Sequence, residues 1–190
     1  MNKTYISQKK FEKTDFTQRA LAIGEYENCS FINCNFSNAN LSGFNFSECE
    51  FIGCNLSMVK IVKTVLNNIR FKDCKLLGVN FDNCNQFTFS LYFENSILNL
   101  ASFYKLNLKK IKFKNCSLQE VDFTECDLSN SIFDACDLSR TIFKNTNLDK
   151  ADLRSAFNYS IDPEVNKVKK AKFSKEGVIG LLDKYEIEIE

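Results

Sequence analysis

The sequence predicts an all-β solenoid of about seven coils with a short C-terminal module, and two observations support this prediction. The first is an apolar residue at every fifth position from Ile6 to Phe81, and again from Phe93 to Leu153. The second is a column of small residues two positions before these apolar ones. A period of five matches neither a helix nor a strand. It suits a chain that turns a corner in each pentad, so that four pentads close one square coil.

The interior positions of the pentads are mostly Phe and Leu, and a narrow interior filled by these side chains needs small residues beside them. All nine cysteines fall in the column of small residues, as Cys29, Cys34 and Cys49 illustrate. We therefore predict buried free thiols that act as small apolar side chains. A metal site or disulfides are the alternatives, but the chain has no histidine and no Cys-x-x-Cys motif.

The register slips by two residues between Phe81 and Phe93. The intervening segment, residues 82–92, must absorb two extra residues as a bulge, a kink or a small loop. The favoured interpretation is a bulge in which Phe87 and Phe89 still pack inward. The alternative is an irregular segment that exposes an aromatic side chain to a partner.

The repeat pattern fades near Ala156, which predicts a solenoid domain over residues 1–157 and a C-terminal module over residues 158–190. Asp162 and Pro163 are typical of a helix start, and Ser174 of a second N-cap. The second helix would carry one apolar face, formed by Val178, Ile179, Leu181, Leu182 and Tyr185. Residues 186–190 alternate like an edge strand. We expect this module to cap the end of the solenoid.

Several pentads share one pattern, as in Ala39-Asn40-Leu41-Ser42-Gly43 and Cys126-Asp127-Leu128-Ser129. This pattern resembles the consensus Ala-(Asp/Asn)-Leu-x-x of the pentapeptide-repeat family, over about residues 6–157. The resemblance implies a right-handed quadrilateral β-helix. Residues 166–190 are similar to the C-terminal modules of quinolone-resistance members, which form homodimers. On this resemblance we predict a dimer interface at Val178, Leu181, Leu182, Tyr185, Ile187 and Ile189.

Nothing in the sequence indicates catalysis or a cofactor. Histidine, the commonest general base, is absent, and no glycine-rich phosphate loop is present. No apolar stretch is long enough to span a membrane, and the first residues do not resemble a signal peptide. We therefore expect a non-enzymatic, cytoplasmic protein.

The net charge of +1 hides alternating bands along the sequence. Two bands contain acids and no bases, and they are the candidate partner-facing surface: Glu25, Glu27, Glu48, Glu50, Glu120, Asp122, Glu125, Asp127, Asp134 and Asp137. Nucleic-acid binding would need a continuous basic stripe. The only local basic candidate is Lys105, Lys109, Lys110, Lys112 and Lys114, for which a solvated face is the favoured explanation.

Two functions remain open at this stage. The resemblance to quinolone-resistance members implies a DNA mimic that binds DNA gyrase or topoisomerase IV, whereas the near-neutral charge disfavours mimicry of a polyanion. The alternative is a dimeric scaffold for another protein partner. An acidic stripe along one face would favour the first function, and a mosaic of charge on every face would favour the second.

Overall fold

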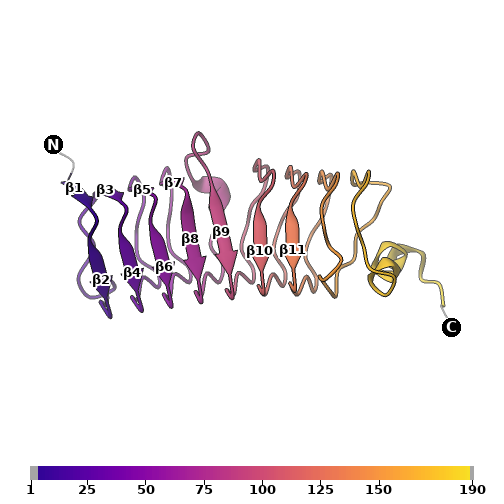
Figure 1. Ribbon diagram of the computed structural model, residues 1–190, viewed down its shortest axis with the longest axis horizontal. Coiled ribbons are helices and arrows are strands. Elements are labelled where there is room, and N and C mark those ends of the chain that lie inside the picture. The colour runs from indigo at the N-terminus through magenta and orange to yellow at the C-terminus, as the bar shows by residue number, and fades with distance from the viewer. Residues whose placement is uncertain (1–3, 189–190) are drawn as a thin grey trace.

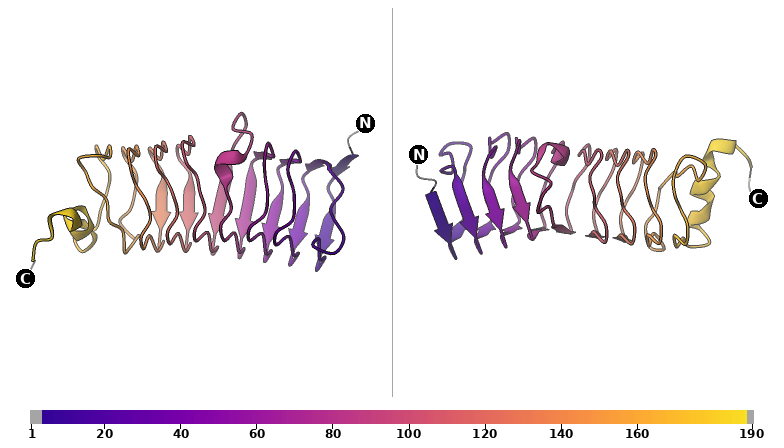
Figure 2. Two further views of the ribbon diagram at one scale, coloured as in Figure 1. Left: turned by 180° about the vertical axis from the view of Figure 1, so that it is seen from behind. Right: turned by 90° about the horizontal axis from the view of Figure 1, so that it is seen from above.

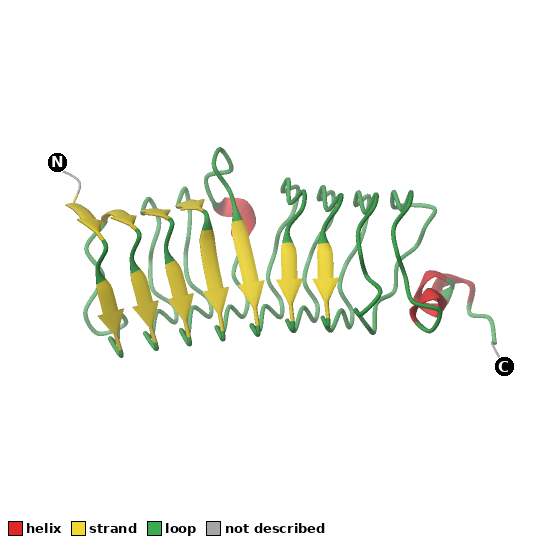
Figure 3. Ribbon diagram, viewed as in Figure 1, coloured by secondary structure: helices red, strands yellow, loops and turns green. Residues whose placement is uncertain are grey.

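The computed structural model describes residues 4–188 and shows a rod of parallel strands stacked along its length (Figure 1). One face carries four strands, β1 (Thr4–Ser7), β3 (Gly24–Glu27), β5 (Asn45–Ser47) and β7 (Val65–Asn67). The adjoining face carries seven, β2 (Lys10–Glu12), β4 (Ser30–Ile32), β6 (Glu50–Ile52), β8 (Ile69–Lys72), β9 (Leu91–Glu94), β10 (Lys112–Lys114) and β11 (Ile132–Asp134). Isolated parallel bridges link the other sides of the coils, which Figure 3 draws as loops. The predicted all-β solenoid of about seven turns is confirmed.

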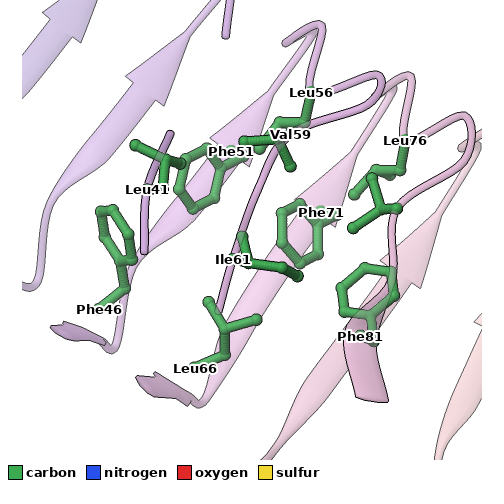
Figure 4. A pocket seen from close by; sticks show the side chains of 11 residues that line it. Leu41, Phe46, Phe51, Leu56, Val59, Ile61, Leu66, Phe71, Leu76 and Phe81 are labelled. Atoms are coloured by element: carbon green, nitrogen blue, oxygen red, sulfur yellow. The ribbon is translucent and has the colours of Figure 1, made fainter. Parts of the chain in front are cut away.

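Interior side chains of successive coils stack directly on one another. Phe11 pairs with Phe31, and Phe31 with Phe51, at the spacing of one coil. Their ring centroids lie 4.9 and 4.7 Å apart with nearly parallel planes, and such stacked rings add to the energy of simple burial. Figure 4 shows how Phe51, Phe71 and the neighbouring aliphatic side chains fill the interior. They leave a void of only about 20 Å³. The period of five in the sequence therefore corresponds to the spacing of these stacked interior residues along the chain.

Most pentads turn their corner at the residue two places after the interior residue, where the backbone has positive φ. Asn28, Asn33 and Asn38 have φ values of 50°, 52° and 56°, and Gly53 has 63°. Asn and Gly tolerate this left-handed conformation better than other residues do. Many corners are closed by a backbone hydrogen bond across the turn, such as that from the Ala39 N–H to the Phe36 carbonyl (2.9 Å). These are the turns in which an αL residue fits without strain.

The corners after Tyr26 and Phe31 are instead bridged by a cysteine of the next coil. The Cys29 N–H donates to Sγ of Cys49 (3.4 Å), and the Cys49 thiol donates to the Tyr26 carbonyl (3.3 Å). Cys54 makes the same two contacts with Cys34 and Phe31. All nine cysteines are buried free thiols, as predicted. Cys49 and Cys54 are more than small apolar side chains, because at these corners they also hydrogen-bond to backbone groups of the preceding coil.

Replacing Cys49 with Ala is expected to lower the free energy of unfolding by about 1–2 kcal/mol, because two backbone groups lose their partner. Cys49→Ser is expected to cost less, since a hydroxyl can make both contacts. Ser96 already accepts the Cys74 N–H in this way (3.1 Å). Urea unfolding of the three proteins measures both differences. Equal losses for Ala and Ser would show that the thiol only fills space.

The register slip lies between Asn85 and Leu91. Asn85 pairs with Val65 at the normal spacing of one coil, whereas Leu91 pairs with Ile69 two residues later than that spacing. The extra residues follow the short 3₁₀ helix η1 (Phe81–Asn83) and form a loop that rises above the rod just before β9 (Figures 1 and 2).

The C-terminal end departs from the predicted module in four ways. Coil pairing continues past residue 157, through the bridges Asn147–Lys167 and Asp152–Lys172. Asp162 begins no helix; its carboxylate accepts the Glu164 N–H (2.8 Å) in a tight turn. The Ser174 hydroxyl accepts the Gly177 N–H (2.9 Å), as predicted for a cap, but two short 3₁₀ helices follow: η2 (Gly177–Leu181) and η3 (Asp183–Tyr185). Residues 186–188 form no strand, and the remainder of that predicted strand lies outside the described residues.

Candidate partner-binding surfaces

The loop at the register slip, residues 85–90, exposes an aromatic side chain. Phe87 is 94% exposed, the largest value among the described large apolar side chains. The Asn85 carboxamide oxygen accepts the Phe87 N–H (3.0 Å) and so fixes the start of the loop. Phe89 is half-buried against the core, with its ring 6.5 Å from that of Phe81. The inward packing expected of Phe89 is therefore found, whereas that expected of Phe87 is wrong, because a loop held at Asn85 and Phe89 carries Phe87 outward. We call residues 85–90 the Phe87 loop.

The first acidic band lies on two adjoining faces of the rod and is already held by neighbouring polar groups. Glu25 and Glu27 belong to β3, and Glu50 belongs to β6. The Tyr5 hydroxyl donates to Glu27, the Asn68 amide to Glu48 and the Ser30 hydroxyl to Glu50, the last at 2.9 Å. Glu50 also stands beside Arg70 in the β6–β8 register. The band is thus a local acidic patch next to a base.

The second acidic band winds around the rod. Its members, Glu120, Asp122, Glu125, Asp127, Asp134 and Asp137, span nearly one coil of sequence and so face every side. Several are paired: Arg140 with Glu120 (2.6 Å), Lys105 with Glu125 (3.5 Å) and Lys109 with Asp127 (3.3 Å). Asp137 accepts from Gln119 (2.7 Å) and Ser139 (2.6 Å). Consecutive residues run once around the rod in each coil, so a band of acids in the sequence forms a ring in space. A stripe along the rod would instead need a charge that recurs once per coil.

The outward positions on the seven-stranded face show the same mixture. Read from β2 to β11, one row of paired residues is Lys10, Ser30, Glu50, Arg70, Tyr92, Lys112 and Ile132. Glu94 lies between Lys114 and Arg70, at 3.0 Å from each, and these cations lower the pKa of its carboxyl group. The basic cluster predicted at residues 105–114 is divided in the same way, since three of its lysines pair with Glu125, Asp127 and Glu94. The surface is a mosaic of both signs.

The C-terminal helices lie against the last coil through Tyr159. Gly177 and Gly180 leave room for this side chain: a Cβ on Gly177 would lie 2.1 Å from the Tyr159 hydroxyl oxygen, and one on Gly180 would lie 2.0 Å from its carbonyl oxygen. Lys184 in η3 contacts Asp162 (2.8 Å) and Glu164 (2.6 Å), which raises the pKa of the lysine. The Tyr185 hydroxyl donates to Glu164 (2.9 Å). The module is thus docked onto the end of the rod, as Figure 1 shows.

This docking divides the residues predicted for a dimer interface. Leu181 packs against the core and Leu182 is half-buried, so both mainly serve the docking of the module. Val178, Tyr185 and Ile187 are exposed, together with Ile179, which the sequence assigned to the same apolar face. Ile189 lies outside the described residues. An exposed apolar group therefore remains at the end of the rod.

Burial keeps two of the interior thiols in their protonated form. Burial raises the pKa of Cys49 and of Cys126 to about 12, so these thiols stay protonated at neutral pH. Among residues 4–188, no group of three or more Cys, Asp or Glu side chains is placed to hold a metal ion. No helix in the same range has the length and apolar character needed to cross a membrane.

Comparisons with known proteins agree with this geometry. Two solved structures of QnrB1, described as a plasmid-mediated fluoroquinolone resistance protein, share the fold. A trypsin-treated form is 20% identical, covers 98% of this chain and 100% of that chain, and has a TM-score of 0.63. The full-length form is also 20% identical, covers 97% of this chain and 100% of that chain, and has a TM-score of 0.62. Curated protein sequences give no match.

Family models cover the repeats directly. A model described as pentapeptide repeat region matches residues 25–103 and 45–123, and one described as pentapeptide repeats (8 copies) matches residues 116–154. These ranges include more than half of the chain, and the chain therefore belongs to the pentapeptide-repeat family.

Proposed function

We propose that this protein is a non-enzymatic rod that binds DNA gyrase or topoisomerase IV and protects the enzyme against quinolones. The observation that carries the proposal is the continuous rod with a loop near its middle, on which Phe87 is the most exposed of the described large apolar side chains. Aromatic residues, phenylalanine included, are enriched at protein interfaces compared with the rest of the surface. The fold shared with a fluoroquinolone resistance protein over the full length of both chains makes a topoisomerase the first partner to test.

Charge mimicry of DNA is not part of this proposal. Duplex DNA carries a dense, continuous negative charge, whereas the acids of this rod form a local patch and a ring of largely paired carboxylates. Binding would instead rest on the shape of the rod and on the Phe87 loop, with the local charges fixing orientation.

A second candidate is a dimeric scaffold that binds another protein and no topoisomerase. The mosaic of charge on the seven-stranded face favours it, because alternating signs suit one specific partner surface. For both candidates we propose a homodimer through the exposed apolar residues of the C-terminal module. The candidates differ in whether purified gyrase or topoisomerase IV binds.

Direct binding to immobilised gyrase and to topoisomerase IV tests the proposal. Saturable binding to either enzyme at micromolar concentration or below is expected. If neither enzyme binds, the topoisomerase proposal fails and the scaffold stands.

Phe87→Ala is expected to weaken that binding roughly tenfold or more, which is typical of an aromatic residue at an interface centre. The free energy of unfolding is expected to change by less than about 0.5 kcal/mol, because the side chain is exposed. Phe157→Ala, which removes an exposed Phe elsewhere on the rod, is the matched control and is expected to bind normally. Unchanged binding of the Phe87 variant would exclude the loop from the interface.

A further inference from the structure

The N-terminal end of the rod differs from the C-terminal end, because no element of residues 4–188 covers it. β1 pairs only with β3, and β2 pairs only with β4, so each is the edge of its sheet. The other end carries the docked helices η2 and η3 (Figure 2). An edge strand presents unpaired backbone donors and acceptors, to which an extended segment of another chain can add.

A hollow of about 390 Å³ opens at this end, over the last rings of the interior ladder. Phe11 and Leu21 are only half-buried there, whereas Phe31 and Leu41, which occupy the same places in the next coil, are 0% and 3% exposed. The first coil therefore leaves Phe11 and Leu21 partly exposed, whereas the matching side chains of the second coil are covered. An apolar side chain placed over Phe11 would continue the stack that Phe11 and Phe31 begin.

Two cations line this hollow at positions that hold uncharged side chains in the later coils. Lys9 and Arg19 occupy the column that holds Cys29 and Ala39 one coil further on, and both line the hollow. The Lys9 ammonium lies 5.0 Å from the centroid of the Phe11 ring. Because Phe31 stacks on that ring at 4.9 Å, Lys9 occupies its open face. Such a cation–π contact is weak at an exposed site and can be exchanged for a stronger one.

We propose that the N-terminal end of the rod binds an extended segment of a partner protein, added as a strand beside β2. The segment carries a carboxylate two residues before an aromatic side chain. In the coils, two residues separated by one other residue both point inward. In the added segment, the first would therefore lie over Lys9 and the second over Phe11. The aromatic side chain displaces Lys9 from the ring and stacks on Phe11, and the carboxylate pairs with the released ammonium. This site is independent of the topoisomerase proposal and of the Phe87 loop.

The backbone pattern of the coils also fixes the register of the added strand. The N–H of an interior residue donates to the carbonyl that precedes the stacked residue of the next coil, as from Phe36 to Asn55 (2.7 Å) and from Phe16 to Asn35 (2.8 Å). By the same pattern, the N–H of the peptide's aromatic residue donates to the Lys10 carbonyl. Strand addition requires this backbone hydrogen bond, whereas simple contact between an apolar side chain and the hollow does not.

The test measures fluorescence anisotropy of a labelled peptide, acetyl-Ser-Asp-Ser-Phe-Ser-Asn-amide, titrated with the full chain. Saturable binding below about 1 mM is expected. A peptide with Lys in place of Asp is expected to bind more weakly, by a factor of roughly five or more. N-methylation of the Phe amide is expected to weaken binding roughly two- to tenfold. No saturable binding, or equal binding of all three peptides, would overturn the proposal.

A matched pair of variants tests the position of the charge. Lys9→Ser is expected to weaken peptide binding roughly two- to fivefold. Lys10→Ser removes the same charge from the next residue, whose side chain is exposed and paired with Glu12 at 2.8 Å, and binding is expected to change little. Melting curves of both variants check that the first coil is intact. Equal losses in the two variants would mean that general attraction, and not this site, holds the peptide.

Discussion

Replacing Phe133 with Asp is expected to unfold the rod. Phe133 is 0% exposed and stacks on Phe113 with ring centroids 5.3 Å apart. The substitution removes that ring and buries a carboxylate without a partner, for a loss of at least about 5 kcal/mol. Since each coil contacts mainly its neighbours, a break at this level also releases the last coils and the docked helices. Far-ultraviolet circular dichroism and the melting temperature of the purified variant measure the result.

Ile132→Asp is the matched control for this prediction. Ile132 precedes Phe133 in β11 but points outward and is 36% exposed, so the same charge can remain in water. This variant is expected to lose less than about 1 kcal/mol. A Phe133 variant that keeps the β signal and melting temperature of the unmodified protein would contradict the assignment of Phe133 to the interior.

Val178→Asp combined with Ile187→Asp is expected to give a folded monomer. Both side chains are exposed on the docked module, so in a dimer they would be buried while the fold of each protomer does not need them. Two charges in each copy of a two-fold interface are expected to raise the dimer dissociation constant at least about a thousandfold. Light scattering at several concentrations measures the mass, and circular dichroism checks the fold.

Ile23→Asp combined with Val62→Asp is the control for the dimer. Both are exposed apolar residues of the rod outside the module, and these changes are expected to leave the dimer intact. Loss of the dimer in the control, or an unchanged dimer in the Val178 and Ile187 variant, would place the interface elsewhere. A monomeric unmodified protein would remove the dimer altogether.

The interior of the rod could be predicted from the sequence because one observation, the period of five, follows directly from its geometry. Phe31, Phe51 and Phe113 are interior residues in the sequence pattern and in the structure alike. The last coil was missed because Asn158 and Pro163 occupy interior places of the pattern, which resumes at Val168 and Phe173. Asn and Gly recur at several of the corners, and they are a sequence signal for positive φ.

The surface was harder to predict, since it depends on how sequence neighbours are distributed around a coil. Acids that form one band in the sequence lie on different faces, and bases of the adjoining coils neutralise Glu120, Glu125 and Asp127. In the sequence, Phe87 cannot be told apart from the phenylalanines of the interior. Only the pairing of Asn85 and Leu91 with the preceding coil shows that Phe87 lies in a loop. Lys9 and Arg19 are charged residues in a column that is otherwise uncharged. This difference was the available sequence signal for the N-terminal hollow.

The most direct test of the proposed function is fluoroquinolone-stabilised DNA cleavage by purified gyrase, measured while this protein is titrated in. Cleavage is expected to fall, and supercoiling to return, at low micromolar protein. The Phe87→Ala variant is expected to need roughly tenfold more protein for the same effect. If this protein changes neither cleavage nor supercoiling, for gyrase and for topoisomerase IV alike, the proposed function is wrong.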